Sequence, residues 1–254
     1  MGPVGNQRAP LRLLAGVGLA ELRPDPARPR GWTLLVNGVP QSYVDLDDPG
    51  HLEFPYQRMI GAAIAVREPV LHLGGGGLTL PRLIEHRRPG TPQVVIERDP
   101  VIAALVRRNL PYPGTIDVRI GDAREALEAA GPESYGLIIA DVFVGAAMPR
   151  SVAERGFAVA ARHALRPDGL LAMNLTDVPP LAQTRVQVAT VGTIFEQSVL
   201  YGEEPVLRGR RVGNLILLAG NVPAIKAGKN ERVLRGDDLS KFATGARPLL
   251  DEPR

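Results

Sequence analysis

Apolar residues recur with two spacings from residue 69 onwards, and their alternation predicts a layered α/β domain. Apolar runs of four to eight residues are typical of buried strands, whereas apolar residues three and four apart are typical of helices. The predicted strands are 70–73, 93–97, 116–120, 135–141, 169–175, 194–201 and 212–219. The predicted helices are 79–88, 99–109, 123–130, 149–165 and 179–191. Because strands that alternate with helices form a parallel sheet, we expect a seven-stranded, doubly wound, mostly parallel sheet.

The last two predicted strands have no helical pattern between them. They should therefore pair as a hairpin and place one antiparallel strand in the sheet. Beyond them, residues 222–254 are charged and interrupted by Gly and Pro, which favours a surface tail that is partly disordered.

The residues before the main domain predict a small β extension. Trp32–Val36 and Val39–Val44 flank Asn37-Gly38, a pair that tolerates the positive φ angles of a tight hairpin. Residues 52–66 have helical spacing and lead into the main domain. The segment 1–30 is rich in Pro, Gly and Arg, so we expect a flexible start with an edge strand near 18–22. The expected organisation is 1–30 flexible, 31–68 hairpin and linking helix, 69–221 main domain, and 222–254 tail.

Composition narrows the class of protein. The 254 residues contain no cysteine, which excludes disulfides, thiolate metal sites and a cysteine nucleophile. The histidines show no metal-ligand spacing, and no metal is expected. No run of about 18 uncharged apolar residues is present, so we expect no membrane partner and a cytoplasmic location. The net charge of +3 comes from scattered arginines, and nucleic acid is not an expected partner.

A run of four glycines, Gly74, Gly75, Gly76 and Gly77, lies between the first predicted strand and a helix. Glycine lets the backbone turn sharply and approach a ligand closely, and the helix that follows presents unpaired N–H groups. A strand, a glycine turn and a helix in this order are typical of a nucleotide-type site. A plain loop is the alternative interpretation of the run by itself.

An acidic residue, Glu97, ends the next predicted strand, 21 residues after Gly76. This is close to the spacing of about 20 residues at which a carboxylate bridges the two hydroxyls of a ribose. The alternative interpretation is that Glu97 caps the helix that begins near Asp99.

Two further acids follow strands at the same predicted sheet edge. Asp122, in Gly121-Asp122-Ala123, suits contact with an exocyclic amine such as that of adenine, and it equally suits the N-cap of the next helix. Asp141 closes a buried strand and opens a loop. A carboxylate there can orient or deprotonate an amine or hydroxyl acceptor, or it can be a structural loop acid.

These motifs together resemble the spermidine synthase family, a branch of the class I S-adenosylmethionine methyltransferase fold. Residues 37–42 resemble the family's Asp-Gly-x-x-Gln stretch, and residues 53–56 resemble its Glu-Phe-x-Tyr motif, over a match that runs from about 32 to 219. The resemblance implies donor contacts and catalytic roles for particular residues. Donor contacts fall on Gln41, Gly74, Gly75, Gly76, Gly77, Glu97, Asp122, Ala123 and Asp141, and catalytic roles fall on Asp141 and Tyr56. It also implies a Rossmann-like fold and a homodimer.

The chain departs from the family pattern at three positions. Gly77 stands where aminopropyltransferases carry an aspartate, Val144 stands where a second acid follows Asp141, and Gln57 follows Tyr56 in place of histidine. A dication without a buried partner is costly, and an aspartate in the loop would repel the carboxylate of intact S-adenosylmethionine. A glycine at 77 leaves backbone N–H groups to receive that carboxylate.

The sequence therefore favours an enzyme that binds S-adenosylmethionine and transfers a group, most readily methyl, to a small-molecule acceptor. One alternative is aminopropyl transfer, as in a polyamine synthase, from decarboxylated S-adenosylmethionine. A second alternative is a nucleoside-binding protein that kept the fold and lost turnover.

Overall fold

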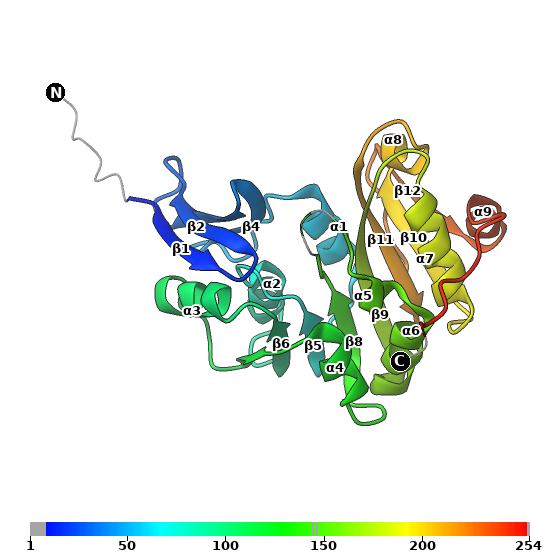
Figure 1. Ribbon diagram of the computed structural model, residues 1–254, viewed down its shortest axis with the longest axis horizontal. Coiled ribbons are helices and arrows are strands. Elements are labelled where there is room, and N and C mark those ends of the chain that lie inside the picture. Colours follow the sequence, from blue (N-terminus) through cyan, green and yellow to red (C-terminus); the bar gives the residue numbers. More distant parts are fainter. Residues whose placement is uncertain (1–8, 144, 146, 253–254) are drawn as a thin grey trace.

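A computed structural model describes residues 9–143, 145 and 147–252, which form two β-sheets with helices packed around them (Figure 1). The larger sheet has eight strands in the order β12-β10-β11-β9-β8-β5-β6-β7. Its strands are β5 (Val70–Leu73), β6 (Gln93–Glu97), β7 (Ile116–Ile120), β8 (Tyr135–Ala140), β9 (Leu165–Asp177), β10 (Ser198–Glu203), β11 (Gly213–Gly220) and β12 (Glu231–Arg235). The α/β class and the mostly parallel sheet are confirmed, with eight strands in place of seven.

Strand directions follow the expected pattern. The pairs β5·β6, β5·β8, β6·β7 and β8·β9 are parallel. Strand β11 runs antiparallel between β9 and β10, so the predicted hairpin is confirmed. A short helix, α8 (Glu204–Leu207), lies in the hairpin connection, where no helix was expected.

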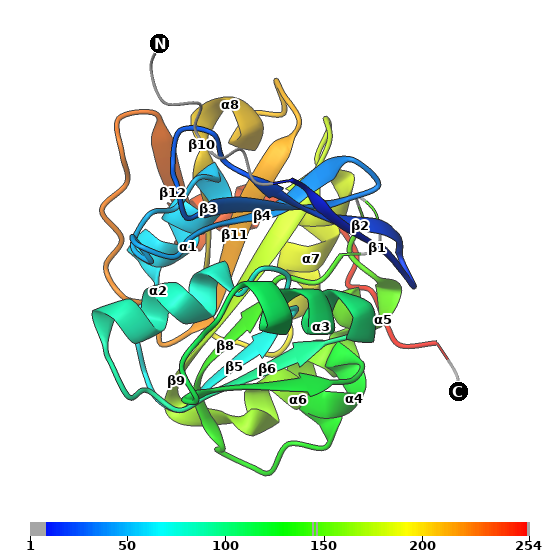
Figure 2. The same ribbon diagram turned by 90° about the vertical axis from the view of Figure 1, so that its left-hand side faces the viewer.

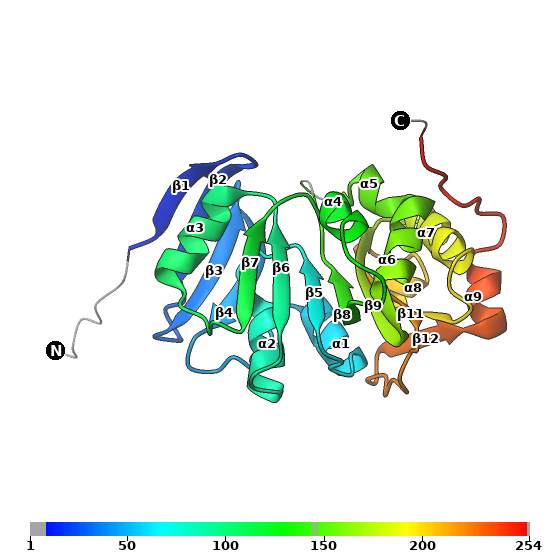
Figure 3. The ribbon, with the colours of Figure 1, turned by 90° about the horizontal axis from the view of Figure 1, so that it is seen from below.

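Helices cover both faces of this sheet, as Figure 3 shows. One face carries α1 (Pro55–Ala63) and α2 (Thr79–Arg87) over a buried cluster that includes Ile60, Ile84 and Ile216. The other face carries α4 (Ala123–Glu128), α5 (Arg150–Ala153), α6 (Arg155–Ala164) and α7 (Ala182–Gly192). The helix expected over 149–165 is thus two helices, which break at Glu154 where the backbone is extended (ψ 157°).

The N-terminal residues form a four-stranded antiparallel sheet beside α3 (Pro100–Asn109) (Figure 2). Its strands are β1 (Leu11–Ala15), β2 (Gly18–Pro24), β3 (Gly31–Val36) and β4 (Val39–Asp45). Asn37 and Gly38 both have positive φ in the predicted β3–β4 turn. The strand expected near 18–22 is present as β2, although it lies inside the sheet and not at its edge. The expectation of a flexible segment is wrong for 11–15, because β1 pairs with β2 over five residues. Residues 1–8 lie outside the described residues.

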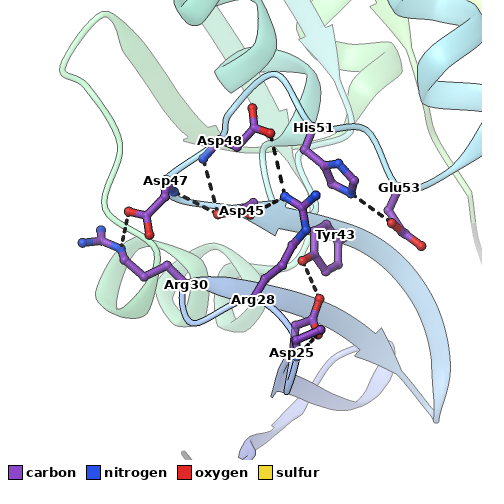
Figure 4. Close-up of polar contacts among 10 residues, drawn as sticks. Asp25, Arg28, Arg30, Tyr43, Asp45, Asp47, Asp48, His51 and Glu53 are labelled. Carbon is purple, nitrogen blue, oxygen red and sulfur yellow. Dashed lines mark hydrogen bonds and ion pairs between the residues drawn. The ribbon is translucent and has the colours of Figure 1, made fainter.

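A network of polar contacts fixes the connection from β4 to α1 (Figure 4). Arg28 Nη1 lies 2.7 Å from Asp45 Oδ2, and Tyr43 donates its hydroxyl hydrogen to Asp25 across 2.7 Å. The Arg28 guanidinium contributes to holding the pKa of the buried Asp45 carboxyl below its usual value, against the effect of burial. The connection therefore leaves the N-terminal sheet in a defined direction, which places the start of α1 over the larger sheet.

The described residues of the C-terminal segment, 222–252, include a strand and a helix, which corrects the expectation of a loose tail over this range. Strand β12 pairs with β10, and α9 (Gly236–Phe242) follows it. Further on, the backbone N–H of Gly156 donates to Asp251 across 2.7 Å, and Arg124 reaches the same carboxylate. Three of the charges that resemble a tail in the sequence, Glu231, Arg232 and Arg235, lie in the edge strand β12, where charged residues prevent unwanted pairing.

None of the helices formed by the described residues is long and apolar enough to cross a membrane. Within the same residues, no group of three or more His, Asp or Glu side chains is placed to hold a metal ion.

Candidate functional site

Four of the predicted site segments meet at one edge of the larger sheet. Glu97 is the last residue of β6, and Asp141, Gly74 and Asp122 lie one or two residues beyond the ends of the adjacent strands β8, β5 and β7. The chain runs outward from β5 to β7 and then returns to β8 on the other side of β5. Open α/β sheets bind ligands at such a reversal, beyond the carboxyl ends of the strands.

Gly74 brings the glycine turn against the loop after β8. Its φ is +96°, and a Cβ atom at this position would lie 2.1 Å from the carbonyl oxygen of Asp141. Only glycine permits both the backbone angle and this approach. The sequence requirement for glycine at 74 thus comes from the fit between two loops.

The N–H groups of the turn donate within the protein. Gly75 N and Gly76 N donate to Glu97 Oε2 across 3.1 and 3.0 Å, and Gly77 N donates to Ser42 Oγ across 2.8 Å. The sequence expectation of backbone N–H groups left to receive a ligand carboxylate is therefore not met in this conformation. Glu97 lies against the glycine turn, and its other oxygen accepts from Asp99 N across 2.9 Å.

Gly77 faces β4. A Cβ atom there would lie 2.8 Å from Ser42 Oγ and 3.2 Å from Val44 Cγ2. An acid added at this position would therefore meet the N-terminal sheet before it could meet a ligand.

We expect Gly77→Asp to destabilise the protein by about 1–3 kcal/mol, because overpacking at a filled contact forces its neighbours to move. Urea unfolding measures this loss, and Gly114→Asp is the control, since a Cβ at 114 would have no heavy atom within 4 Å. A Gly77→Asp variant as stable as Gly114→Asp would show that position 77 has room for the acid.

Asp122 lies one strand further along the same edge and is the N-cap of α4. Its Oδ1 accepts from Arg124 N across 2.8 Å and from Glu125 N across 3.2 Å, and Ala123 is the first, buried residue of that helix. The capping interpretation of Asp122 is thus realised, whereas Glu97 is not the cap of α3, since Asp99 holds that place. A small hollow of about 10 Å³ is lined by Gly75, Gly76 and Glu97 but not by Asp122.

Asp141 and Tyr56 contact each other across 85 residues of sequence. The Tyr56 hydroxyl donates to Asp141 Oδ2 across 3.2 Å, and Asn174 Nδ2 donates to Asp141 Oδ1 across 2.8 Å. Burial raises the pKa of Asp141 above its usual value, and these two hydrogen bonds oppose that rise. Burial and the negative charge of Asp141 raise the pKa of Tyr56 well above 10, so the phenol keeps its proton.

The two glutamines of the predicted site lie in different surroundings. Gln57 is 2% exposed, and its amide Nε2 donates to the Tyr56 hydroxyl across 3.2 Å. Its Oε1 is buried and has no hydrogen-bond partner among the described residues. Gln41 is partly exposed, and its amide donates to the carbonyl of Val39 across 3.2 Å, so it contacts none of the other predicted site residues through that bond.

Three residues of this region were not predicted from the sequence: Ser42, Asn174 and Asn214. Asn174 is 1% exposed in the apolar run Leu170–Leu175, and a single amide within such a run is the signal that could have identified it. Ser42 and Asn214 carry no comparable signal, because each lies among other small or polar residues. Val144, the position of the second missing acid, lies outside the described residues.

No family model matches the chain. It is 29% identical over 128 residues to a polyamine aminopropyltransferase of Vibrio vulnificus, covering 48% of this chain and 43% of that protein. It is also 29% identical over 133 residues to an N-terminal histidine N-methyltransferase of Emericella nidulans, covering 51% and 23%. The chain thus spans about half the length, or less, of the curated relatives that it matches.

Solved structures match over more of the chain. A "probable spermidine synthase" from Corynebacterium glutamicum is 27% identical with a TM-score of 0.89, covering 97% of this chain and 98% of that one. Human methyltransferase-like protein 13, in complex with SAH, is 20% identical with a TM-score of 0.53 over 75% and 89%, and this shows the fold alone. The predicted spermidine synthase-like character and class I methyltransferase fold are confirmed.

Proposed function

We propose that this spermidine synthase-like chain transfers an aminopropyl group from decarboxylated S-adenosylmethionine to an amine nitrogen of a small molecule. The observation that carries the proposal is the acceptor-rich cluster at Asp141, beside a glycine turn whose N–H groups are already engaged. Such a cluster suits amines, and such a turn offers nothing to a carboxylate. These contacts thus favour aminopropyl transfer, which the sequence analysis gave as the alternative to methyl transfer.

The nucleoside half of the donor fits the edge formed by the glycine turn and Glu97. Glu97 Oε1 accepts one protein hydrogen bond, so lone pairs remain on the carboxylate for ribose hydroxyls. We assign the remaining donor contacts to Gln41, Asp122, Ala123 and Asp141. Asp122 caps α4 through Oδ1, which leaves Oδ2 as the oxygen for the base.

A sulfonium donor supplies an electrophilic carbon and leaves as a neutral thioether. The acceptor nitrogen must present a lone pair, so an incoming ammonium has to lose a proton. Asp141 is suited to this step because burial raises the pKa of its carboxyl and so makes it a stronger base. Tyr56 keeps its proton and orients the carboxylate from α1. The new C–N bond forms as the C–S bond breaks, and the amine proton leaves through Asp141.

The buried Oε1 of Gln57 supports an amine substrate. A buried acceptor without a partner costs about 1–3 kcal/mol, and an N–H donor from the ligand would remove that cost. Position 57 would then supply a neutral acceptor next to Tyr56.

Methyl transfer from intact S-adenosylmethionine is the second candidate. It is favoured by the absence of an acid at Gly77 and by the similarity to the N-methyltransferase of Emericella nidulans. A homodimer stays a prediction for either reaction.

Calorimetry with the two donors separates these functions. We expect decarboxylated S-adenosylmethionine to bind at least about tenfold more tightly than the intact donor, a difference of about 1.4 kcal/mol. Mass spectrometry of reactions with mono- and diamines should then show methylthioadenosine and an aminopropylated amine. Preference for the intact donor, with S-adenosylhomocysteine as product, would establish methyl transfer. Donor binding without product from any amine would favour the non-catalytic alternative.

A further inference from the structure

Two side-chain amides, the buried Asn174 and the partly exposed Asn214, connect Asp141 to strands β9 and β11. Asn174 in β9 donates from Nδ2 to Asp141 Oδ1, and Asn214 in β11 donates from Nδ2 to Asn174 Oδ1 across 3.0 Å. Asn214 Nδ2 also donates to Thr176 Oγ1 across 2.8 Å. Thr176 lies directly opposite Asn214 in the antiparallel β9·β11 pair, so sheet register brings these groups together.

The direction of these hydrogen bonds, from Asn214 to Asn174 to Asp141, fixes the orientation of each amide. Asn214 donates from its side-chain nitrogen, so the atom of Asn174 that accepts this hydrogen bond must be the side-chain oxygen. That leaves the Asn174 nitrogen facing the carboxylate. If the side-chain amides of Asn174 and Asn214 were both flipped, the Asn174 oxygen would face an Asp141 oxygen. Only a protonated Asp141 could then donate a hydrogen bond between these two oxygens.

We propose that Asn174 and Asn214 are positioning residues that together hold Asp141 as an oriented, ionised hydrogen-bond acceptor for the transfer reaction. The role in the reaction rests on the proposed function, whereas the control over the charge of Asp141 does not. Asn214 acts on Asp141 indirectly, because its side chain donates to Asn174 and Thr176. Loss of Asn174 removes one of the two hydrogen bonds that oppose the effect of burial on Asp141. Loss of Asn214 removes the donor that holds the Asn174 oxygen away from Asp141, so the Asn174 amide is free to turn over.

Other groups around Asp141 do not supply this control. Tyr56 of α1 is the titratable group in hydrogen-bond contact with Asp141 among the described residues, and it stays protonated. Strands β9 and β11 contribute the amides and Thr176, and the end of β5 contributes the uncharged glycine turn. A structural role alone, as polar filling between two strands, predicts lost stability without any change in the titration of Asp141.

The direct test is the titration of the Asp141 carboxyl by NMR on protein labelled with ¹³C-aspartate, with the signal assigned from its loss in Asp141→Asn. We expect Asn214→Leu and Asn174→Leu each to raise the apparent pKa of this carboxyl by roughly one unit. If the protein is active, the acidic limb of the pH profile of kcat/KM should shift by the same number of pH units. The Kd for the donor should change less than about threefold. Asn214→Thr tests rescue, because its hydroxyl keeps a donor toward Asn174.

Gln93→Leu is the matched control. Gln93 is another buried amide of the same sheet, and its partners are His72 and the carbonyl of Pro81. The Gln93→Leu variant should be less stable than the wild type, but the apparent pKa of Asp141 should be unchanged. An unchanged titration in a folded Asn214→Leu variant, as judged by circular dichroism, would overturn the inference even if transfer is active. If the pKa of Asp141 shifts in the variants but the protein binds no donor, the two amides control the charge of Asp141 and the proposed function is wrong.

Discussion

Gly74→Ala should strongly destabilise the protein and abolish donor binding. The alanine Cβ would lie 2.1 Å from the backbone carbonyl oxygen of Asp141, and the backbone at 74 has a φ of +96°. Because neither loop backbone can move without breaking strand pairs of β5 and β8, the clash is not relieved by a rotamer change. We expect a loss of about 3 kcal/mol or more in the free energy of unfolding, together with loss of donor binding.

Gly90→Ala is the control for the backbone angle alone. Gly90 has a similar φ of +84°, but a Cβ there would meet no heavy atom within 4 Å. Alanine at 90 should cost about 1 kcal/mol, with donor binding retained. Urea unfolding of both variants measures the difference, and equal losses at the two positions would show that the contact with Asp141 contributes nothing.

Asp141→Asn should separate stability from activity. Removing the carboxylate is expected to lower the transfer rate at least about 100-fold, the usual contribution of a positioned base. Donor affinity, measured by calorimetry, should weaken by a smaller factor, because Asp141 is only one of the residues to which we assign donor contacts. A variant that keeps the wild-type rate would remove Asp141 from the reaction and leave it as a loop acid.

The same substitution should stabilise the protein near neutral pH. Burial raises the pKa of Asp141, so the folded state binds this proton more tightly than the unfolded state does. The stability that this group provides is present below the unfolded pKa and is lost as pH rises through the folded value. Asparagine has no such loss, so the melting temperature of Asp141→Asn should exceed that of the wild type at pH 7.5 and approach it at low pH.

Asp177→Asn is the matched control. Asp177 is also buried, and it accepts hydrogen bonds from the backbone and hydroxyl of Thr184 at the start of α7. We expect it to lose stability at pH 7.5 and to keep transfer activity, which is the opposite of Asp141→Asn on both counts.

The predictions from sequence were accurate where the signal is local. Strands β5, β6 and β7 were placed at their observed bounds, because β5 and β6 are mainly apolar, β7 alternates apolar and charged residues, and turn signals stand between them. The β3–β4 hairpin followed from Asn37-Gly38 for the same reason. Strands β1 and β12 were missed because they are edge strands whose residues are mostly exposed or half exposed, whereas β2 lies where a strand was expected near 18–22.

The sequence by itself determined the α/β alternation, the glycine turn, and the three acids that follow β6, β7 and β8, since strand, turn and cap signals act between near neighbours. Tertiary structure alone decided how these groups are used. It engaged the glycine N–H groups with Glu97 and Ser42, turned Gly77 toward β4, and joined Asp141 to Tyr56, Asn174 and Asn214. Hydrogen bonds between residues that are 21 to 85 positions apart depend on how sheets and helices pack, and the order of residues along the chain does not encode that packing locally.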